Sequence, residues 1–275
     1  KMTGEEIEAK VEAEKNRNKN THAFSYEGHN RILLLGEADF SFARAFAQEC
    51  VNNDNMNMNI KIQVTATEYG DGNDIAKRYY DGNVPNMRSS ISSLCQMEVI
   101  KEVICGLNAR VLGQTSADLC PCQKWNKVDK CWDPSSPFWN SESGPENVID
   151  TYFDLIVFNF PHSEQAGRAT KLVRALFKQL RICIDTGRLP GNVVLEMRLR
   201  VIESNPNLKK NIRSFYNHEE AAIESGFELI GCWPSDLTRW ENLGYRHMWT
   251  KKNATCRDIG LNCNVWRWRS AKRDT

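Results

Sequence analysis

One turn near the start of the chain combines residue types that suit a charged ligand. The apolar run 31–35 stops at Gly36. The turn then holds two acids and a serine, in the order Glu37, Ala38, Asp39, Phe40, Ser41. A glycine at the end of a buried parallel strand lets the backbone approach a ligand above the next helix. The dinucleotide fingerprint needs three glycines and only Gly36 is present, so an ordinary buried strand and turn is the alternative.

A second apolar run also ends in residues that can do chemistry. Residues 152–158 lead into Asn159, Phe160, Pro161 and His162. An imidazole at such a turn can accept a proton or orient a ligand near neutral pH. A strand-end turn with a capping histidine is the alternative.

The elements that would position these turns alternate between strands and helices. Strands are predicted at 31–35, 60–67, 109–115, 153–158 and 193–197, with an antiparallel pair at 227–232 and 245–249. Helices are predicted at 42–50, 75–80, 89–107, around 172–184, and from a capping box at Asn217 and Glu220 to Gly226. This order predicts an α/β protein with a mostly parallel, seven-stranded sheet, helices on both faces and an antiparallel hairpin at one edge.

Composition limits the partners that can be expected. Among 275 residues, 36 Lys and Arg face 35 Asp and Glu, so any affinity for RNA must come from a local basic patch. No apolar run approaches the roughly 20 residues that cross a bilayer, and we expect a soluble protein without a membrane partner.

The ten cysteines are scattered through predicted strands, helices and loops. In an unsecreted protein most are expected to be free thiols or small buried residues. Cys120, Cys122 and Cys131 form the one cluster that suggests zinc. Structural zinc sites usually have four ligands and a two-residue spacer, so we expect no metal.

The two turns together resemble a known family. The stretches Gly36-Glu37-Ala38-Asp39-Phe40-Ser41-Phe42 and 152–162 are similar to the signatures G-E-G-D-F-S-F and F-D-x-I-x-F-N-F-P-H of Rossmann-like methyltransferases that modify N3 of a uridine in large-subunit ribosomal RNA. The likeness spans roughly residues 31–250. It implies a class I methyltransferase fold and S-adenosylmethionine (SAM) as the cofactor.

In the resemblance, the turn from Gly36 to Ser41 is the cofactor loop. SAM carries a cationic sulfonium and amino group, which Glu37 or Asp39 could face. Ala38 stands where the family has glycine, so the loop keeps an unstrained conformation only if this residue has a negative φ. Surface acids of an ordinary turn are the alternative.

Further acids are candidates for the rest of the cofactor. An acid at the end of the second strand commonly binds the ribose hydroxyls, and Glu68 has this position, with Asp71 as its competitor. Asp118 follows the predicted third strand and is the candidate for reading adenine N6. A solvated loop acid is the alternative for Asp118.

The resemblance makes the turn from Asn159 to His162 the catalytic site. Asn159 and the backbone of Phe160 and Pro161 would accept a hydrogen bond from the target N–H, and Phe160 would stack on the base. His162 would accept the proton of uracil N3 or orient the base.

Basic residues are the candidates for contacts with RNA. Arg198 and Arg200, in the segment that follows the predicted fifth strand, occupy alternating positions on one face and suit phosphates, and Arg246 lies in the predicted closing hairpin. The tail 265–269 interleaves tryptophan with arginine, as single-strand binders do, although a solvated tail is the stronger alternative.

Three regions follow from these assignments. Residues 1–22 form a charged arm, disordered or a solvated helix. Residues 31–250 form the methyltransferase domain, with 118–150 as an insertion or lid loop. Residues 251–275 form a basic, Trp-containing tail.

The leading hypothesis is a SAM-dependent methyltransferase that acts on N3 of a uridine in large-subunit ribosomal RNA. An inactive methyltransferase-like module that binds RNA or protein is the alternative, motivated by Ala38 and by an altered segment after the fifth strand. We expect RNA as the partner, no DNA, a monomer, and a location in the nucleolus or nucleus, with the cytoplasm as the alternative.

Overall fold

The structure is a computed structural model that describes residues 29–54, 62–113, 121–133, 136–138, 153–161, 166–200, 217–235, 237–246 and 263–271. The predicted arm 1–22, Cys120, Asp118 and His162 lie outside these residues, as does the side chain of Arg200.

The centre of the fold is a parallel sheet whose order reverses at its first strand. β1 (Arg31–Leu35) pairs on one side with β2 (Gln63–Thr67) and on the other with β7 (Leu155–Asn159). β2 continues to β3 (Ile100–Cys105), and β7 continues to β8 (Val194–Arg200), all parallel. In such doubly wound sheets, ligands bind beyond the carboxyl ends of the strands at the point of reversal, which here lies between β1 and β7.

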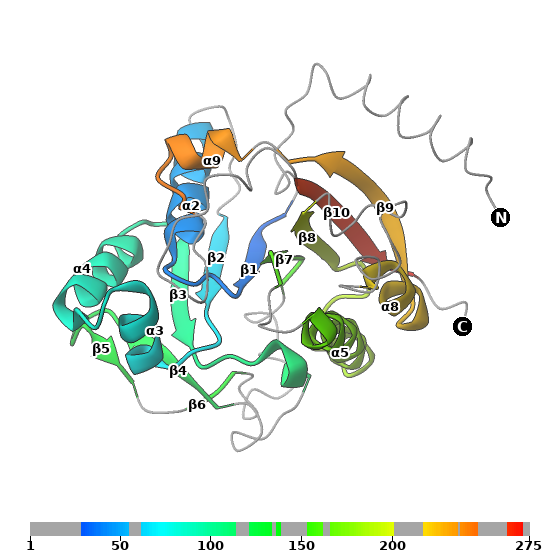
Figure 1. Ribbon diagram of the computed structural model, residues 1–275, viewed down its shortest axis with the longest axis horizontal. Coiled ribbons are helices and arrows are strands. Elements are labelled where there is room, and N and C mark those ends of the chain that lie inside the picture. The colour runs from blue at the N-terminus through cyan, green and yellow to red at the C-terminus, as the bar shows by residue number, and fades with distance from the viewer. Residues whose placement is uncertain are drawn as a thin grey trace.

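Further strands extend the sheet at both edges (Figure 1). The order is β5-β4-β3-β2-β1-β7-β8-β10-β9, and β6 pairs with β4. The added strands are antiparallel to their neighbours: β4 (Pro121–Asn126), β5 (Cys131–Trp132), β6 (Ser136–Pro137), β9 (Phe227–Pro234) and β10 (Cys263–Ser270). The predicted mostly parallel α/β sheet is confirmed. The path from β3 to β9 has the predicted number of seven strands, of which β1, β2, β7, β8 and β9 were predicted in place, and the described residues add three strands beyond β3.

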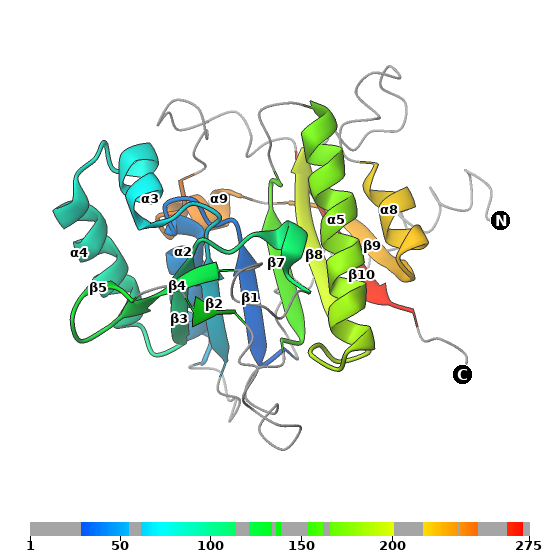
Figure 2. The same cartoon turned by 90° about the horizontal axis from the view of Figure 1, so that it is seen from below.

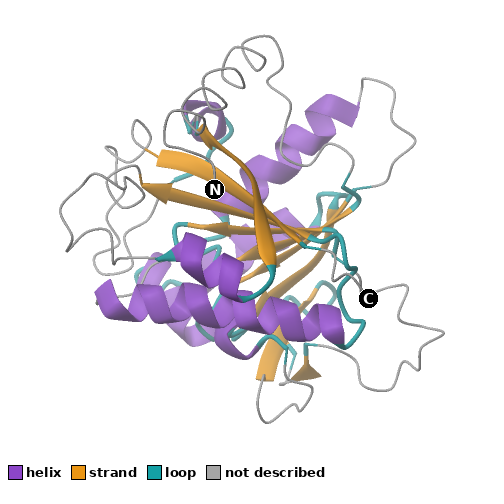
Figure 3. Cartoon of the chain, turned by 90° about the vertical axis from the view of Figure 1, so that its right-hand side faces the viewer, coloured by secondary structure: helices purple, strands orange, loops and turns teal. Residues whose placement is uncertain are grey.

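Helices cover both faces of the sheet, as Figures 2 and 3 show. Alternate residues of β1 point to opposite sides, so Ile32 and Leu34 enter one buried cluster and Leu33 and Leu35 enter the other. The first cluster includes residues of α2 (Ser41–Asp54), α3 (Gly72–Tyr79), α4 (Val84–Cys95) and α9 (Thr238–Asn242). The second includes residues of α5 (Ala166–Asp185), α8 (His218–Glu224) and the 3-10 helix η1 (Ala109–Val111).

The predicted third strand was wrong. The helix predicted over 89–107 ends at Cys95, β3 occupies 100–105, and residues 109–111 form η1 instead of a strand. Ile100 and Ile104 happen to continue the helical spacing of α4, but Val99, Ile100, Val103 and Ile104 are β-branched residues that favour a strand.

The predicted closing hairpin and the tail were also wrong. β9 pairs with β10. Of the predicted partner strand 245–249, Tyr245 and Arg246 lie in neither a helix nor a strand, and 247–249 lie outside the described residues. β10 lies between β8 and β9, with Trp266 and Trp268 buried and Arg267 and Arg269 ion-paired. The alternation of Trp and Arg is therefore the period of a half-buried strand, and the domain continues beyond residue 250.

The capping box predicted at the start of α8 does not form. Asn217 precedes the helix with φ 42° and makes no side-chain cap, and its amide instead donates to the carboxylate of Glu220. Gly226, with φ 75°, follows the end of the helix as expected.

Candidate functional site

The two predicted turns lie side by side. Leu35 of β1 pairs in register with Phe158 of β7, so Gly36 and Asn159 leave the same edge of the sheet as neighbours. The helix α2 begins at Ser41, directly after the first turn. This arrangement is the one that the apolar runs predicted.

The backbone of the first turn is unusual. Gly36 has φ 68°, and a Cβ at this position would lie 2.8 Å from Cε2 of Phe158. Ala38 has φ 52° and Phe40 has φ 59°, so both adopt the left-handed conformation. This conformation costs about 1–2 kcal/mol for a residue with a side chain. Ala38 therefore does not have the negative φ that an unstrained loop would require.

Three acids at this edge are almost fully buried. Glu37 is 5% exposed, Asp39 4% and Glu68 6%. Burial raises the pKa of each carboxyl above its ordinary range, that of Glu37 most plainly, since Glu68 and Asp39 add repulsion. Hydrogen bonding offsets part of the rise for Asp39 and Glu68.

Glu37 differs from the other two acids because neither of its carboxylate oxygens has a hydrogen-bond partner of ordinary geometry among the described residues. The amide of Ala43, in the first turn of α2, partly offsets the rise in the pKa of Glu37. A buried carboxylate without a partner is costly unless a cation or donor faces it. The geometry of Glu37 suits a cationic ligand.

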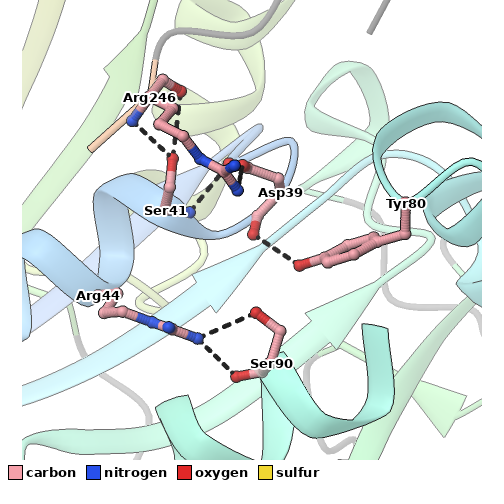
Figure 4. A network of polar contacts seen from close by, with 6 residues as sticks. All are labelled: Asp39, Ser41, Arg44, Tyr80, Ser90 and Arg246. Atoms are coloured by element: carbon pink, nitrogen blue, oxygen red, sulfur yellow. Dashed lines mark hydrogen bonds and ion pairs between the residues drawn. The ribbon is translucent and has the colours of Figure 1, made fainter. Parts of the chain in front are cut away.

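Asp39, by contrast, is bound within the protein (Figure 4). Its carboxylate accepts from the Ser41 amide at 3.0 Å and from the Arg246 guanidinium at 3.1 Å. The backbone N–H of Arg246 donates to the Ser41 hydroxyl, which lies 3.1 Å from the Arg246 carbonyl. Tyr80 donates its hydroxyl to the Asp39 carbonyl at 3.0 Å. Arg246, predicted to contact RNA, thus fastens the turn through its ion pair with Asp39, while its side chain stays 61% exposed.

Glu68 follows β2 and supports the same turn. Its carboxylate accepts from the Ala38 amide at 2.9 Å, which holds Ala38 in its left-handed conformation. Asp71, the predicted competitor, caps α3 by accepting from the amides of Asn73 and Asp74. Tyr69, which sequence reasoning missed, stands next to Glu68 with 60% of its surface exposed. An exposed aromatic beside a strand-end acid is the signal that could have found it.

The second turn begins with a constrained amide. Asn159 is 8% exposed, and its Oδ1 accepts from Nη1 of Arg198 at 2.7 Å. Its Nδ2 is buried without a hydrogen-bond partner among the described residues. Phe160 has φ 47° and donates its backbone N–H to the Arg198 carbonyl at 2.9 Å, and Pro161 is buried. His162 lies outside the description.

The prediction that Arg198 contacts phosphate was wrong. Its side chain is buried, pairs with Glu196 at 3.0 Å, and lies over the rings of Phe42 and Trp240 at 5.2 and 5.7 Å. β8 is an internal strand covered on both faces, so an alternating arginine there points into the protein. β8 runs to Arg200, three residues beyond the predicted end of the fifth strand, and sequence reasoning missed the contact of Arg198 with Asn159.

The described cysteines are free thiols. Cys131 pairs with Asn126 at one end of β4, while Cys122 pairs with Ser136 near the other end. No group of three His, Cys, Asp or Glu side chains among the described residues could hold a metal ion. Within the same residues, no helix is long and apolar enough to cross a membrane.

Comparison with known proteins identifies the family. Residues 33–248 match the model of the BMT5-like family, described as rRNA (uridine-N3-)-methyltransferase BTM5-like. The chain belongs to the BMT5-like family. It is therefore a SAM-dependent methyltransferase whose family acts on uridine N3 of ribosomal RNA, as the two signatures predicted.

Solved structures with a similar fold are distant from this BMT5-like chain. An antibiotic-related methyltransferase is 11% identical, with 99% of this chain and 96% of that chain covered and a TM-score of 0.43. The SAM-dependent methyltransferase SibL in its apo form is 10% identical, with 98% and 60% covered and a TM-score of 0.44. The StiE O-methyltransferase, residues 961–1257, is 11% identical, with 98% and 78% covered and a TM-score of 0.41. These scores are too low to support an argument about function. No curated protein sequence matches the chain.

The residues at the edge of the sheet fit SAM. The Glu37 carboxylate, which has no hydrogen-bond partner of ordinary geometry among the described residues, suits the cationic end of the cofactor, and the missing side chain of Gly36 leaves its backbone open to close approach. Glu68, at the end of β2, has the position of a ribose-binding acid. The BMT5-like chain thus keeps the features that its cofactor needs, although Ala38 replaces a glycine.

Proposed function

We propose that methyl transfer to uridine N3 takes place between the end of β1 and the end of β7. The observation that carries this proposal is the pairing of Leu35 with Phe158, which sets the loop at Gly36 beside Asn159. Bound SAM supplies an electrophilic methyl group on a positively charged sulfur. Two buried groups lack a hydrogen-bond partner of ordinary geometry in the part of the chain that the structure describes: the Glu37 carboxylate suits cation binding, and the Asn159 amide nitrogen suits base binding.

On the cofactor side, Glu37 holds the cationic end, and the turn from Gly36 to Ser41 provides the backbone surface. Asp39 and Ser41 act indirectly, because their polar groups are bound to Arg246. Glu68 supports Ala38 and faces the ribose, and the exposed ring of Tyr69 provides a stacking surface for adenine.

On the base side, Asn159 and Phe160 hold and stack on the uracil, and Pro161 fixes the turn. Uracil N3 keeps its proton at neutral pH, so a base must remove it. His162 is proposed for that step. With SAM bound, the cofactor would supply the methyl group, and the imidazole of His162 would take the proton that N3 gives up as it accepts that group.

The wider setting is also proposed. RNA is the substrate of the family, and we propose that the chain acts on it as a monomer, does not modify DNA, and resides in the nucleolus or nucleus. Arg200 and Asp118 remain candidates for phosphate and adenine contacts. Light scattering, methylation assays on duplex DNA, and microscopy of the tagged chain test these points in turn.

The central test pairs cofactor affinity with product analysis. Isothermal titration measures SAM binding, and nucleoside mass spectrometry measures methyl transfer to ribosomal RNA that lacks the modification. Asn159→Ala is expected to cost about 100-fold in rate and His162→Ala about 10²–10⁴-fold, both with near wild-type SAM affinity. Full activity in both variants would refute the assignment of the second turn. A product other than N3-methyluridine would exclude the proposed target atom, and absence of SAM binding by the wild type would favour a binding module.

A further inference from the structure

The contact between Arg198 and Asn159 fixes which end of the amide is free. A guanidinium carries only hydrogen-bond donors, so the atom of Asn159 that lies 2.7 Å from Nη1 of Arg198 must be the oxygen. The amide nitrogen is then the group left over. It is buried and lacks a partner among the described residues. Asn159 therefore offers an unpartnered donor to a ligand, while its oxygen already has a charged partner.

Arg198 is held firmly enough to impose this orientation. Glu196 is completely buried and pairs with Arg198 at 3.0 Å and with Arg267, on the adjacent strand β10, at 2.9 Å. The rings of Phe42 and Trp240 lie against the guanidinium. The Arg198 carbonyl also accepts from the Phe160 amide, which ties the strand to the start of the second turn.

A hydrogen-bond donor on Asn159 would contact a carbonyl oxygen of uracil, whereas an acceptor would contact the N3–H. Uracil N3 lies between two carbonyl groups, and removal of its proton moves negative charge onto their oxygens. An N–H group backed by a buried cation stabilises that charge, as donors do for other developing oxyanions. We propose that Asn159 donates its Nδ2 to a carbonyl oxygen next to N3 of the target uracil, and that Arg198 is the positioning residue that fixes this orientation.

This inference rests on the proposed function and reverses one part of it that the sequence alone suggested, namely that Asn159 accepts from the N3–H. The donor lowers the free energy needed to ionise N3 and leaves His162 as the proton acceptor. The protein thus makes uracil N3–H more acidic and also supplies the group that takes its proton.

The decisive variant is Asn159→Asp. It keeps an oxygen for Arg198 and nearly the same shape, but it replaces the donor with a second acceptor. The wild type is first shown to produce N3-methyluridine, since failure there concerns the proposed function and not this inference. Loss of one oxyanion donor typically costs about 10²–10³-fold, so we expect the rate of methyl transfer to fall by about 100-fold or more. SAM affinity should change by less than about threefold.

The outcomes separate cleanly. If Asn159→Asp keeps more than about a tenth of the wild-type rate, the side chain acts as an acceptor and the inference is overturned. If SAM affinity falls by more than about tenfold, the amide serves the cofactor and the inference is also overturned. Should Asn159→Asp fail to fold, Asn159→Ala takes its place in the following experiment, which needs only measurable activity.

A second experiment tests the acidity of the base directly. RNA that carries 5-fluorouridine has a more acidic N3–H, so it should need the donor less. Arg198→Lys keeps a positive charge for Glu196, but its single ammonium loses the fork that reaches both Glu196 and Asn159. The methyl-transfer rate of Arg198→Lys should fall on ordinary RNA, and its pH–rate profile should shift to higher pH. On RNA that carries 5-fluorouridine, the ratio of the variant's rate to the wild-type rate should rise by about tenfold.

Arg269→Lys is the matched control, because Arg269 pairs with Glu228 at an exposed site on the neighbouring strand β10. The Arg269→Lys variant should have the wild-type pH–rate profile and the wild-type ratio of rates on fluorinated and ordinary RNA. A merely structural role of Arg198 would lower the rate equally at every pH and on both RNAs, and that result would overturn the positioning role.

Discussion

Replacing Glu37 with glutamine should stabilise the free protein while weakening its hold on SAM. Both carboxylate oxygens are buried without a hydrogen bond of ordinary geometry from a described residue, the Ala43 amide offsets only part of the cost, and burial raises the pKa of Glu37 well above its ordinary value of 4.5. An unsatisfied buried polar group costs about 1–3 kcal/mol, and more when it is charged. Glutamine removes the charge, so the free energy of unfolding should rise by about 1–2 kcal/mol at pH 7.5. A domain of about 200 residues gains about 2–4 °C in Tm per kcal/mol.

The stability gained in Glu37→Gln should depend on pH in a definite direction. Because the pKa of Glu37 is raised in the folded state, the cost of its charge is absent below pH 4.5 and is complete above the folded-state pKa. The advantage of Glu37→Gln should therefore disappear near pH 4. Thermal unfolding of both proteins at pH 7.5 and pH 4 measures the difference. Glu98→Gln, at an exposed acid, is the control and should change stability by less than about 0.5 kcal/mol.

SAM should offset the stability advantage of Glu37→Gln. At 100 times its Kd, SAM stabilises the wild type by about 2.7 kcal/mol. Loss of a charge-assisted contact of about 1.5–3 kcal/mol weakens binding roughly ten- to a hundredfold, so the same SAM concentration stabilises Glu37→Gln by only about 0.4–1.4 kcal/mol. S-adenosylhomocysteine, which lacks the sulfonium charge, shows which cation Glu37 faces. Wild-type SAM affinity in Glu37→Gln would refute the role, and an unchanged Tm would show that the carboxylate is already compensated.

Four other outcomes are expected. Gly36→Val should abolish SAM binding and lower Tm by about 4 °C or more, because its Cβ would meet Phe158 at 2.8 Å in a left-handed conformation; a normal melting curve would contradict the clash. Ala38→Gly should raise the free energy of unfolding by up to about 1 kcal/mol in calorimetry, since it relieves the strain at φ 52° but adds freedom to the unfolded chain, and a loss of stability would argue against that strain. Burial lowers the pKa of His218 from 6.5 to about 4. The stability that the neutral imidazole provides should therefore be complete above pH 6.5, and the free energy of unfolding should fall by up to about 3 kcal/mol towards pH 4. Urea unfolding of His218→Phe should not show this loss. Elemental analysis should find no stoichiometric zinc, and one zinc per chain would restore the cysteine cluster as a site.

Much of the central sheet could be predicted because its signals are local. The apolar runs at 31–35 and 153–158 have no alternation and end at turn-forming residues, which is what a strand buried on both faces requires. The sequence did not reveal β3, because the spacing of Ile100 and Ile104 fits a helix and a strand equally well over a short window. β10 was lost because alternating Trp and Arg suit a stacking surface as well as a half-buried strand, and the pairing with β8 is a long-range contact.

The candidate site divides in the same way. Gly36 and Asn159 could be brought together from sequence, because parallel strands that follow one another end at one edge of a sheet. The hydrogen-bond and ion-pair partners of the side chains in these turns could not be predicted from the sequence. Asp39 is paired with a residue 207 positions away, and Asn159 is oriented by a residue 39 positions away. No local pattern carries such information, so the choice between Glu37 and Asp39, and the change from an acceptor to a donor role for Asn159, needed the fold.

The distribution of charge at this edge explains why Glu37 and Asn159 are the groups that remain. Asp39 is paired with Arg246, Glu68 accepts from the Ala38 amide, and Arg198 is shared between Glu196 and Asn159. These contacts fix the backbone of both turns. The Glu37 carboxylate and the Asn159 amide N–H lack a hydrogen-bond partner of ordinary geometry among the described residues, and they match a cation and a carbonyl oxygen. The free protein loses stability by burying them, and binding of cofactor and base restores it, so the same atoms that make the site costly also make it selective.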